Sequence, residues 1–197
     1  MRSLTLSSVS TTEPVSLDEA KNHLRIQTTA EDTQIQTWIT VARKQCENLT
    51  RRALVSSSWL LVTDDFCSDA IVIPRPPLSS LSSLVVITYT KTTGDSTTVS
   101  STVYDVDYRM EPAQIRLAYD QSWPTDVRDQ PGSVSIAYKS GYSTATIPQE
   151  MRQWILERVG VFYNHRESLI LDPRTLGEIP RSFVDGLLDE YRIIEAI

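Results

Sequence analysis

Apolar side chains recur every three or four residues in two regions of the chain, one before residue 57 and the other after residue 145. This spacing places them on one face of a helix. The first region predicts two helices, and the shorter one lies in SLDEAKNHLRI with a capping box of Ser16 and Glu19 at its start. The longer helix follows a second box-like start at Thr29-Ala30-Glu31-Asp32. Its apolar face carries Ile35, Trp38, Ile39, Ala42, Cys46 and Leu49.

The second helical region begins at Ile147-Pro148, because proline is favoured in the first turn of a helix. In IPQEMRQWILERVGVFYNHRE the main stripe is formed by Met151, Ile155, Val159, Phe162 and Arg166, with Trp154 on its flank. A break at LDPRTLGEIP separates this helix from the last predicted one, PRSFVDGLLDEYRI. The final residues, RIIEAI, form an apolar tail that a lone monomer has little reason to keep.

Between the two helical regions the pattern changes to short extended runs rich in Val, Ile, Thr and Tyr. These runs are SWLLVTDDF, AIVIP, SLVVITYTK, TVYDVDYRM, AQIRL and SVSIAYK. Thr92-Thr93-Gly94-Asp95 predicts a hairpin turn. Arg75-Pro76-Pro77 predicts an extended corner that ends a strand, since two prolines remove two ladder donors. A polyproline recognition site is the functional alternative for that corner.

The predicted fold is α+β, with a small helical bundle of two N-terminal and two C-terminal helices and an inserted antiparallel β-rich module. We expect a flexible arm over residues 1–14, because that stretch is rich in Ser and Thr. The helical core then covers residues 15–56 and 146–191, the β-rich module residues 57–145, and the tail residues 192–197.

Charge narrows the possible partners. The chain has 25 acidic and 19 basic residues, a net charge of −6, which argues against a broad cationic face that binds nucleic acid. Arg43, Lys44, Arg51 and Arg52 gather toward the end of the second helix, where cations complement the helix dipole. The same cluster could instead meet an acidic partner, and a DNA-binding module built on it remains an alternative. The start lacks a signal-peptide core and no apolar run is long enough to span a bilayer, so we expect no membrane partner.

Chemistry-bearing motifs are sparse. Glycine-rich phosphate loops, HExxH and GxSxG are all missing from the sequence. The two cysteines, Cys46 and Cys67, lack CxxC spacing, and Cys46 is expected to be a buried, inert thiol. The pairs Asp64-Asp65 and Asp105/Asp107 could bind a divalent cation or carry out acid–base chemistry. A metal-dependent or hydrolytic enzyme that uses His165 or Asp105/Asp107 is therefore an alternative function.

The stretch FYNHRE, residues 162–167, places His165 two positions before Glu167. Residues two apart on a helix point to different sides, so these two side chains cannot easily form a hydrogen-bonded dyad. Arg166 shares the apolar stripe and can bury its stem while its head finds a carboxylate. We therefore interpret FYNHRE as the end of an amphipathic helix, with His and Arg where cations are favoured.

Several stretches in order resemble the head–tail connector proteins of long-tailed bacteriophages. They are SLDEAKNHLRI, ENLTRRALVSSSW, IPRPPLSSLSSL, YDVDYRM, PGSVSIAYKSGY, IPQEMRQWILERVGVFYNHRES and LLDEYRI. The match is closer to the longer branch of that family, which carries a β-rich insertion and also occurs in prophages and gene-transfer agents. The resemblance extends from about Ser16 to Ile193 and depends on the ordered set of motifs rather than on a single one.

This resemblance implies a structural protein of the virion, assembled in the host cytoplasm, with no catalytic residue, metal or cofactor. Such proteins form a ring, usually twelvefold, at the head–tail junction. The implied partners are the portal protein, neighbouring copies in the ring, the next connector (stopper) or a tail-completion protein, and passing double-stranded DNA without sequence specificity. We expect contacts with the portal or the neighbouring subunit at Arg43, Arg51, Arg52, Arg166, Arg192, Ile193, Ile194 and Ile197.

Overall fold

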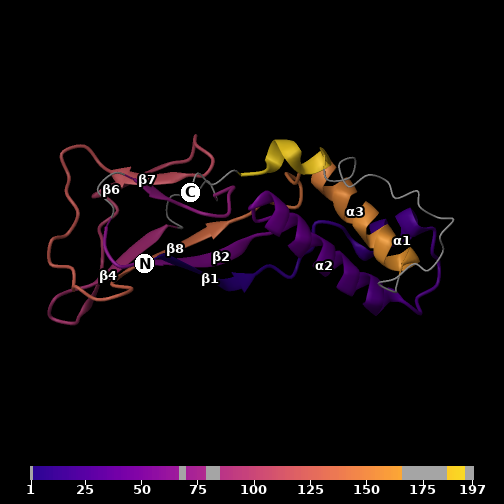
Figure 1. The fold of residues 1–197 in the computed structure, drawn as a ribbon, viewed down its shortest axis with the longest axis horizontal. Helices are drawn as coiled ribbons and strands as arrows, with labels where there is room; N and C mark the ends of the chain where they lie inside the picture. The colour runs from indigo at the N-terminus through magenta and orange to yellow at the C-terminus, as the bar shows by residue number, and fades with distance from the viewer. Residues whose placement is uncertain (1, 67–69, 79–84, 166–185, 194–197) are drawn as a thin grey trace, which may run out of the picture. The chain divides into compact units, whose positions relative to one another are not determined.

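The computed structural model describes residues 2–66, 70–78, 85–165 and 186–193, and the chain divides into two compact units (Figure 1). One unit, called the β unit here, comprises residues 1–10 and 55–142. The other, called the helical unit, comprises residues 11–54 and 143–197. The predicted α+β class is confirmed, and helices precede and follow the antiparallel β-rich insertion along the chain.

The helical unit contains three α-helices and a short 3-10 helix within the described residues. They are α1 (Leu17–Leu24), α2 (Asp32–Thr50), α3 (Gln149–Asn164) and η2 (Gly186–Tyr191). The last helix was predicted to be an α-helix. That prediction is wrong for the part that the structure describes, because residues 186–191 form a 3-10 helix. None of the described helices combines the length and the apolarity that crossing a membrane requires.

Local signals set the start of α1 but not that of α2. The amide of Glu19 donates to Ser16 Oγ (3.1 Å), and the amide of Ser16 donates to Glu19 Oε2 (3.3 Å), so the predicted capping box is present. The box-like start of the second helix was a wrong prediction. Its N-cap is Glu31, whose side chain makes no capping hydrogen bond.

The core of the helical unit lies between α1, α2 and α3, and the predicted face of α2 is mostly buried. Trp38 is only half-buried and Leu49 is exposed, while α3 contributes Met151, Ile155 and Val159 as expected. Trp154 was predicted on the flank but is fully buried. A large aromatic side chain at the edge of the apolar face can still extend into the core. The spacing of apolar residues in the sequence does not reveal this.

The described residues of the β unit form two antiparallel sheets. The strands are β1 (Arg2–Val9), β2 (Ser57–Thr63), β3 (Ile71–Val72), β4 (Val86–Thr90), β5 (Ser96–Thr98), β6 (Tyr104–Asp107), β7 (Gln114–Leu117) and β8 (Val134–Ser140). The five-stranded sheet has the order β1-β2-β8-β4-β5, and the three-stranded sheet has the order β3-β7-β6. Buried side chains of both sheets, among them Leu61, Ile115, Ile136 and Tyr138, share one apolar cluster.

Strand β1 corrects the expected flexible arm over residues 1–14. Residues 2–9 pair antiparallel with β2, from Arg2 opposite Thr63 to Val9 opposite Ser57, with an irregularity between Leu6 and Ser8. Most of its side chains are exposed, so the strand is held chiefly by backbone hydrogen bonds. A Ser- and Thr-rich strand of this kind has little apolar pattern, and composition alone therefore suggests an arm.

The predicted turn is present in the β unit, and Arg75-Pro76-Pro77 forms a corner after β3. The predicted extended conformation is wrong at Arg75, whose φ is 60°. Gly94, with φ of 99°, donates to the carbonyl of Lys91 (2.8 Å) in the β4–β5 hairpin. At the proline corner, the hydroxyl of Tyr138 donates to the carbonyl of Pro74 (2.9 Å). The amide of Gly141 donates to the carbonyl of Pro77 (2.8 Å). The corner thus packs on its own unit, which disfavours a polyproline recognition site.

Gly141 generates a stability prediction. Its φ is 121°, and a Cβ at this position would overlap the carbonyl of Val55. We expect Gly141→Ala to destabilise the β unit by about 3 kcal/mol, measured by urea unfolding of the purified protein. The control is Gly160→Ala in α3, where a Cβ would lie 3.8 Å from His23 Nε2. That change should leave stability unchanged or raise it by about 0.5 kcal/mol. Equal effects of the two substitutions would contradict this account of Gly141.

Candidate functional site

The structure brings several predicted site residues together at the C-terminal end of α2. The amide of Ile193 donates to the carbonyl of Thr50 (3.1 Å), and Nε of Arg52 donates to the carbonyl of Tyr191 (2.7 Å). The hydroxyl of Tyr191 in turn donates to Glu150 Oε2 at the start of α3 (3.0 Å). We call these five residues, Thr50, Arg52, Glu150, Tyr191 and Ile193, the tail anchor, because they hold the chain directly before residues 194–197.

The end of α2 explains why this anchor forms. The last carbonyls of a helix have no partner within the helix, and the amide of Ile193 satisfies that of Thr50. Arg51 adopts a left-handed conformation (φ 60°) and turns the chain away from the helix axis. This turn leaves the side chain of Arg51 exposed and that of Arg52 buried. Leu188 of η2 is fully buried, so apolar packing adds to the hydrogen bonds.

The burial of Arg43 in the helical unit disfavours its expected role at an interface. It is 4% exposed, with Nε 2.7 Å from Glu13 Oε2 and Nη1 2.9 Å from Glu47 Oε2. Thr40 also donates to Glu13 (2.8 Å), and the other carboxylate oxygen of Glu47 accepts from the amide of Leu54 (3.0 Å). Because a buried guanidinium needs paired carboxylates, Arg43 is a structural residue of the helical unit.

The predicted basic cluster is therefore not a patch of four exposed cations. Arg43 and Arg52 are buried, whereas Lys44 and Arg51 are exposed. Two cations give only a weak, salt-sensitive attraction to DNA, which disfavours the DNA-binding alternative. Arg192 is exposed, and its Nε lies 3.4 Å from Asp189 Oδ1. The other three candidates, Arg166, Ile194 and Ile197, lie outside the described residues.

Hydrogen bonds engage one carboxylate of each predicted pair in the β unit, Asp107 and Asp64. Both oxygens of Asp107 accept from the Arg109 guanidinium at 3.0 Å, and these bonds lower the pKa of Asp107 to about 2. Asp105 faces Arg116 across the β6–β7 ladder. Asp64 accepts from the amide of Gly132 (2.9 Å). Across the described ranges, no cluster of three or more His, Cys, Asp or Glu side chains could hold a metal ion.

The interpretation of FYNHRE as a helix end is confirmed where the structure describes it. Helix α3 ends at Asn164, and His165 is its exposed C-cap, with its amide donating to the carbonyl of Val161 (2.9 Å). Glu167 lies outside the described residues. Cys46 is buried as expected, and burial, followed by the charge of Glu47, raises the pKa of its thiol to about 12. A thiol with so high a pKa is not a nucleophile near neutral pH.

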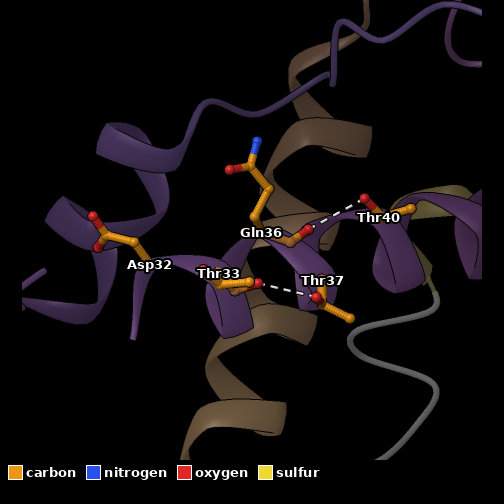
Figure 2. A pocket seen from close by; sticks show the side chains of 5 residues that line it. All are labelled: Asp32, Thr33, Gln36, Thr37 and Thr40. Carbon is orange, nitrogen blue, oxygen red and sulfur yellow. Dashed lines mark hydrogen bonds between the residues drawn. The ribbon is translucent and has the colours of Figure 1, made fainter. Parts of the chain in front are cut away.

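A hollow of about 310 Å³ runs along α2 and is lined by Asp32, Thr33, Gln36, Thr37 and Thr40 (Figure 2). The hydroxyl of Thr37 donates to the carbonyl of Thr33 (3.0 Å), and Asp32 forms an ion pair with Lys21 (2.7 Å). Its lining offers neither a nucleophile paired with a base nor an unpaired carboxylate. The hollow therefore has the character of a polar helix surface rather than that of an active site.

Sequence reasoning missed the acceptor residues of the helical unit. The Arg43–Glu47 pair has the i,i+4 spacing of a helical ion pair and could have been found from the sequence. Glu13 gave no signal, because it lies 30 residues before Arg43 in a stretch taken as an arm. Tyr191 and Glu150 also gave none, since their contact joins two distant parts of the chain.

Comparisons with known proteins agree with this architecture. A family model described as phage gp6-like head-tail connector protein matches residues 14–115. No curated protein sequence matches. Among solved structures, a chain in the neck of an empty gene transfer agent (GTA) particle, computed with C6 symmetry, aligns with a TM-score of 0.79 and 20% identity. That alignment covers 99% of this chain and 97% of the other.

Two further structures give similar alignments. A chain in the virion of a native GTA particle has a TM-score of 0.77 and 19% identity. A chain in the neck of a native GTA particle, computed with C12 symmetry, has a TM-score of 0.75 and 18% identity. Each alignment covers 98% of this chain and 97% of the other. At this level of identity the three structures establish a shared fold.

The buried Arg43 predicts a large effect of its removal. We expect Arg43→Met to destabilise the helical unit by about 3 kcal/mol, because it leaves Glu13 and Glu47 partly buried without their cation. Urea unfolding followed by far-ultraviolet circular dichroism measures the change. The control is Lys44→Met at the neighbouring exposed position, which should change stability by less than about 0.5 kcal/mol. A stable Arg43→Met protein would contradict the structural role assigned to Arg43.

Proposed function

Because the chain belongs to the family of phage gp6-like head–tail connector proteins, we propose that it is a structural connector at the head–tail junction of a tailed phage or a phage-like particle. The proposal includes no catalysis and no cofactor. The observation that carries it is the family match over residues 14–115, supported by a fold shared with chains of GTA necks over nearly the whole length.

In this proposal the chain forms a ring of twelve copies beneath the portal, and the ring extends the DNA channel. The C12 symmetry of one similar neck structure supports the copy number, and the C6 symmetry of another is compatible with twelve copies. Ring subunits make head-to-tail contacts, for which each copy needs two different surfaces. A chain with a separate helical unit and β unit offers such surfaces.

The tail anchor supports docking of the ring to the portal. Residues 194–197 follow directly on Ile193, whose amide is hydrogen-bonded to the end of α2. An apolar tail whose preceding residue is held in place loses less conformational entropy on binding than a tail whose preceding residue moves freely. We propose that this tail docks into the portal protein, while other surfaces of the ring meet the next connector (stopper) or a tail-completion protein.

Charge supports a channel through which DNA moves without being held. The chain is acidic overall, and the burial of Arg43 and Arg52 removes two cations from the surface. Binding to DNA grows with the number of phosphates that a protein neutralises, so each cation withdrawn from the surface weakens it. In this proposal the protein meets double-stranded DNA without sequence specificity and is assembled in the host cytoplasm.

The enzyme alternative receives no support from the geometry of the described residues. His165 is an exposed helix cap, and Asp107 is held by Arg109 rather than positioned beside a second free carboxylate. A general base needs a substrate pocket and a partner that orients it. Arg109 orients Asp107, but neither Asp107 nor His165 lines the hollow along α2.

The proposed ring predicts a particle of defined symmetry. Mixing the purified protein with portal-bearing, tail-less particles should add a ring of density at the portal vertex, visible by electron microscopy with rotational averaging. Particles mixed with the dialysis buffer alone, without the protein, serve as the blank. Unchanged vertices at saturating protein would overturn the connector proposal.

The tail predicts a separation of folding from docking. We expect removal of residues 194–197 to leave the free energy of unfolding within about 0.5 kcal/mol of the original, because the anchor bond of Ile193 is retained. Docking to portal-bearing particles should weaken by at least about tenfold, since the apolar contact surface is lost. Co-sedimentation measures docking, and Lys44→Ala in the full-length chain is the control. Equal docking of the shortened and full-length proteins would reject a role for the tail.

A further inference from the structure

Strand β1 is an open edge of the five-stranded sheet. In the order β1-β2-β8-β4-β5 it is a terminal strand, and all of its ladder partners belong to β2. Figure 1 shows β1 running along the outer side of β2. Among the described residues, no strand pairs with the other side of β1. In a strand, roughly half of the backbone N–H and C=O groups point to each side, so those of β1 that face away from β2 are open to pairing.

This edge lacks most of the features that usually block strand addition. Proteins protect long edges with charged residues, with proline, or by keeping the strand short. The eight-residue sequence RSLTLSSV contains no proline and only one charge, and the guanidinium of that residue, Arg2, donates to the carbonyl of Val72. The irregularity between Leu6 and Ser8 is the only such device in β1. The opposite edge, β5, is protected by its length of three residues.

Apolar side chains accompany the open backbone. Leu4 packs against the core of the β unit, whereas Leu6 is 46% exposed and Val9 is 37% exposed. A strand added beside β1 would cover apolar surface next to the backbone hydrogen bonds that it forms, which is the combination that favours β-strand addition. The uncharged Ser and Thr residues between them give no preference for an acidic or a basic partner.

We propose that β1 is an assembly edge, to which an extended segment of a neighbouring copy of this chain adds as a further strand. This inference rests on the proposed ring, in which identical copies lie side by side. A second copy is the occupant because ring contacts repeat at every subunit and join unlike surfaces, and a free sheet edge is one half of such a contact. DNA is disfavoured as the occupant, because β1 offers no free cation to a phosphate.

The composition of β1 suits an edge that pairs only on assembly. Four of its eight residues are Ser or Thr and only three are apolar, so side-chain contacts add little to backbone pairing between two free copies. Once the portal gathers copies into a ring, the effective concentration of the neighbouring segment is far higher than that in solution. Weak backbone pairing then becomes stable at each subunit boundary.

Hydrogen–deuterium exchange tests the inference directly, with the full-length protein free and assembled on portal-bearing particles. In the free protein, the amides of residues 2–9 that face away from β2 should exchange rapidly. In the assembled ring the same amides should exchange at least about tenfold more slowly, because they become paired. Amides of the interior strand β8 serve as the internal control and should exchange equally slowly in both states.

The outcomes separate this inference from the proposed function. Rings that form without slower exchange in residues 2–9 overturn the assembly edge and leave the connector proposal intact. Slower exchange that appears with isolated portal protein bound to single copies, before neighbours are present, also overturns it, since the occupant is then the portal. If no ring forms under any condition, the proposed function fails and this inference fails with it.

A charge at the edge gives a second measurement. Leu6→Lys should lower the yield of rings by about tenfold, because the added ammonium must be desolvated at each repeated contact. The matched control is Val86→Lys, an apolar residue of similar exposure (39%) in β4, which is an interior strand of the same sheet. The control should assemble normally, and both monomers should keep their circular dichroism spectra. Equal ring yields for the two variants would overturn the assembly edge.

Discussion

The ion pairs of Arg43 are the interaction on which the helical unit depends. A guanidinium buried on α2 joins Glu13, which precedes α1, to Glu47, which also accepts from the amide of Leu54. Glu13 and Leu54 lie next to two of the three points at which the chain passes between its units, after residues 10 and 54, and the third point follows residue 142. One buried charge therefore holds the chain beside two of these three connections, on the side of the helical unit. Such a network tolerates little change, because removing one member leaves another charge buried without compensation.

Features set by neighbouring residues could be predicted from the sequence. The Ser16–Glu19 capping box, the buried face of α2, the helix end at His165 and the hairpin turn at Gly94 all depend on short spacings. Features set by distant residues were missed. Strand β1 has meaning only through its pairing with β2, and Arg43 was counted as a surface cation because Glu13 lies 30 residues away. The anchor bond between Arg52 and Tyr191 joins residues 139 positions apart.

The same division applies to the candidate site. Arg51, Arg52, Arg192 and Ile193 were selected for charge or apolarity, and they gather at one end of α2, but their roles differ. Arg52 is buried as a donor to Tyr191, whereas Arg51 is exposed at a left-handed position. The sequence identifies the charged and apolar residues that are candidates for an interface. Burial then shows whether a cation stabilises the fold or is accessible to a partner. For a protein whose work is assembly, that distinction separates the residues that build each copy from those that copies can share.

The hydrogen bond between Ile193 and Thr50 has a consequence for how such a protein can diverge. Both atoms belong to the main chain, so the bond survives any replacement of residue 193 except proline, which has no amide hydrogen. The position from which the final residues emerge is thus independent of their side chains. Substitutions in that segment can follow changes in a binding partner without moving its starting point. Main-chain atoms therefore determine where the final segment starts, and its side chains determine which partner it fits.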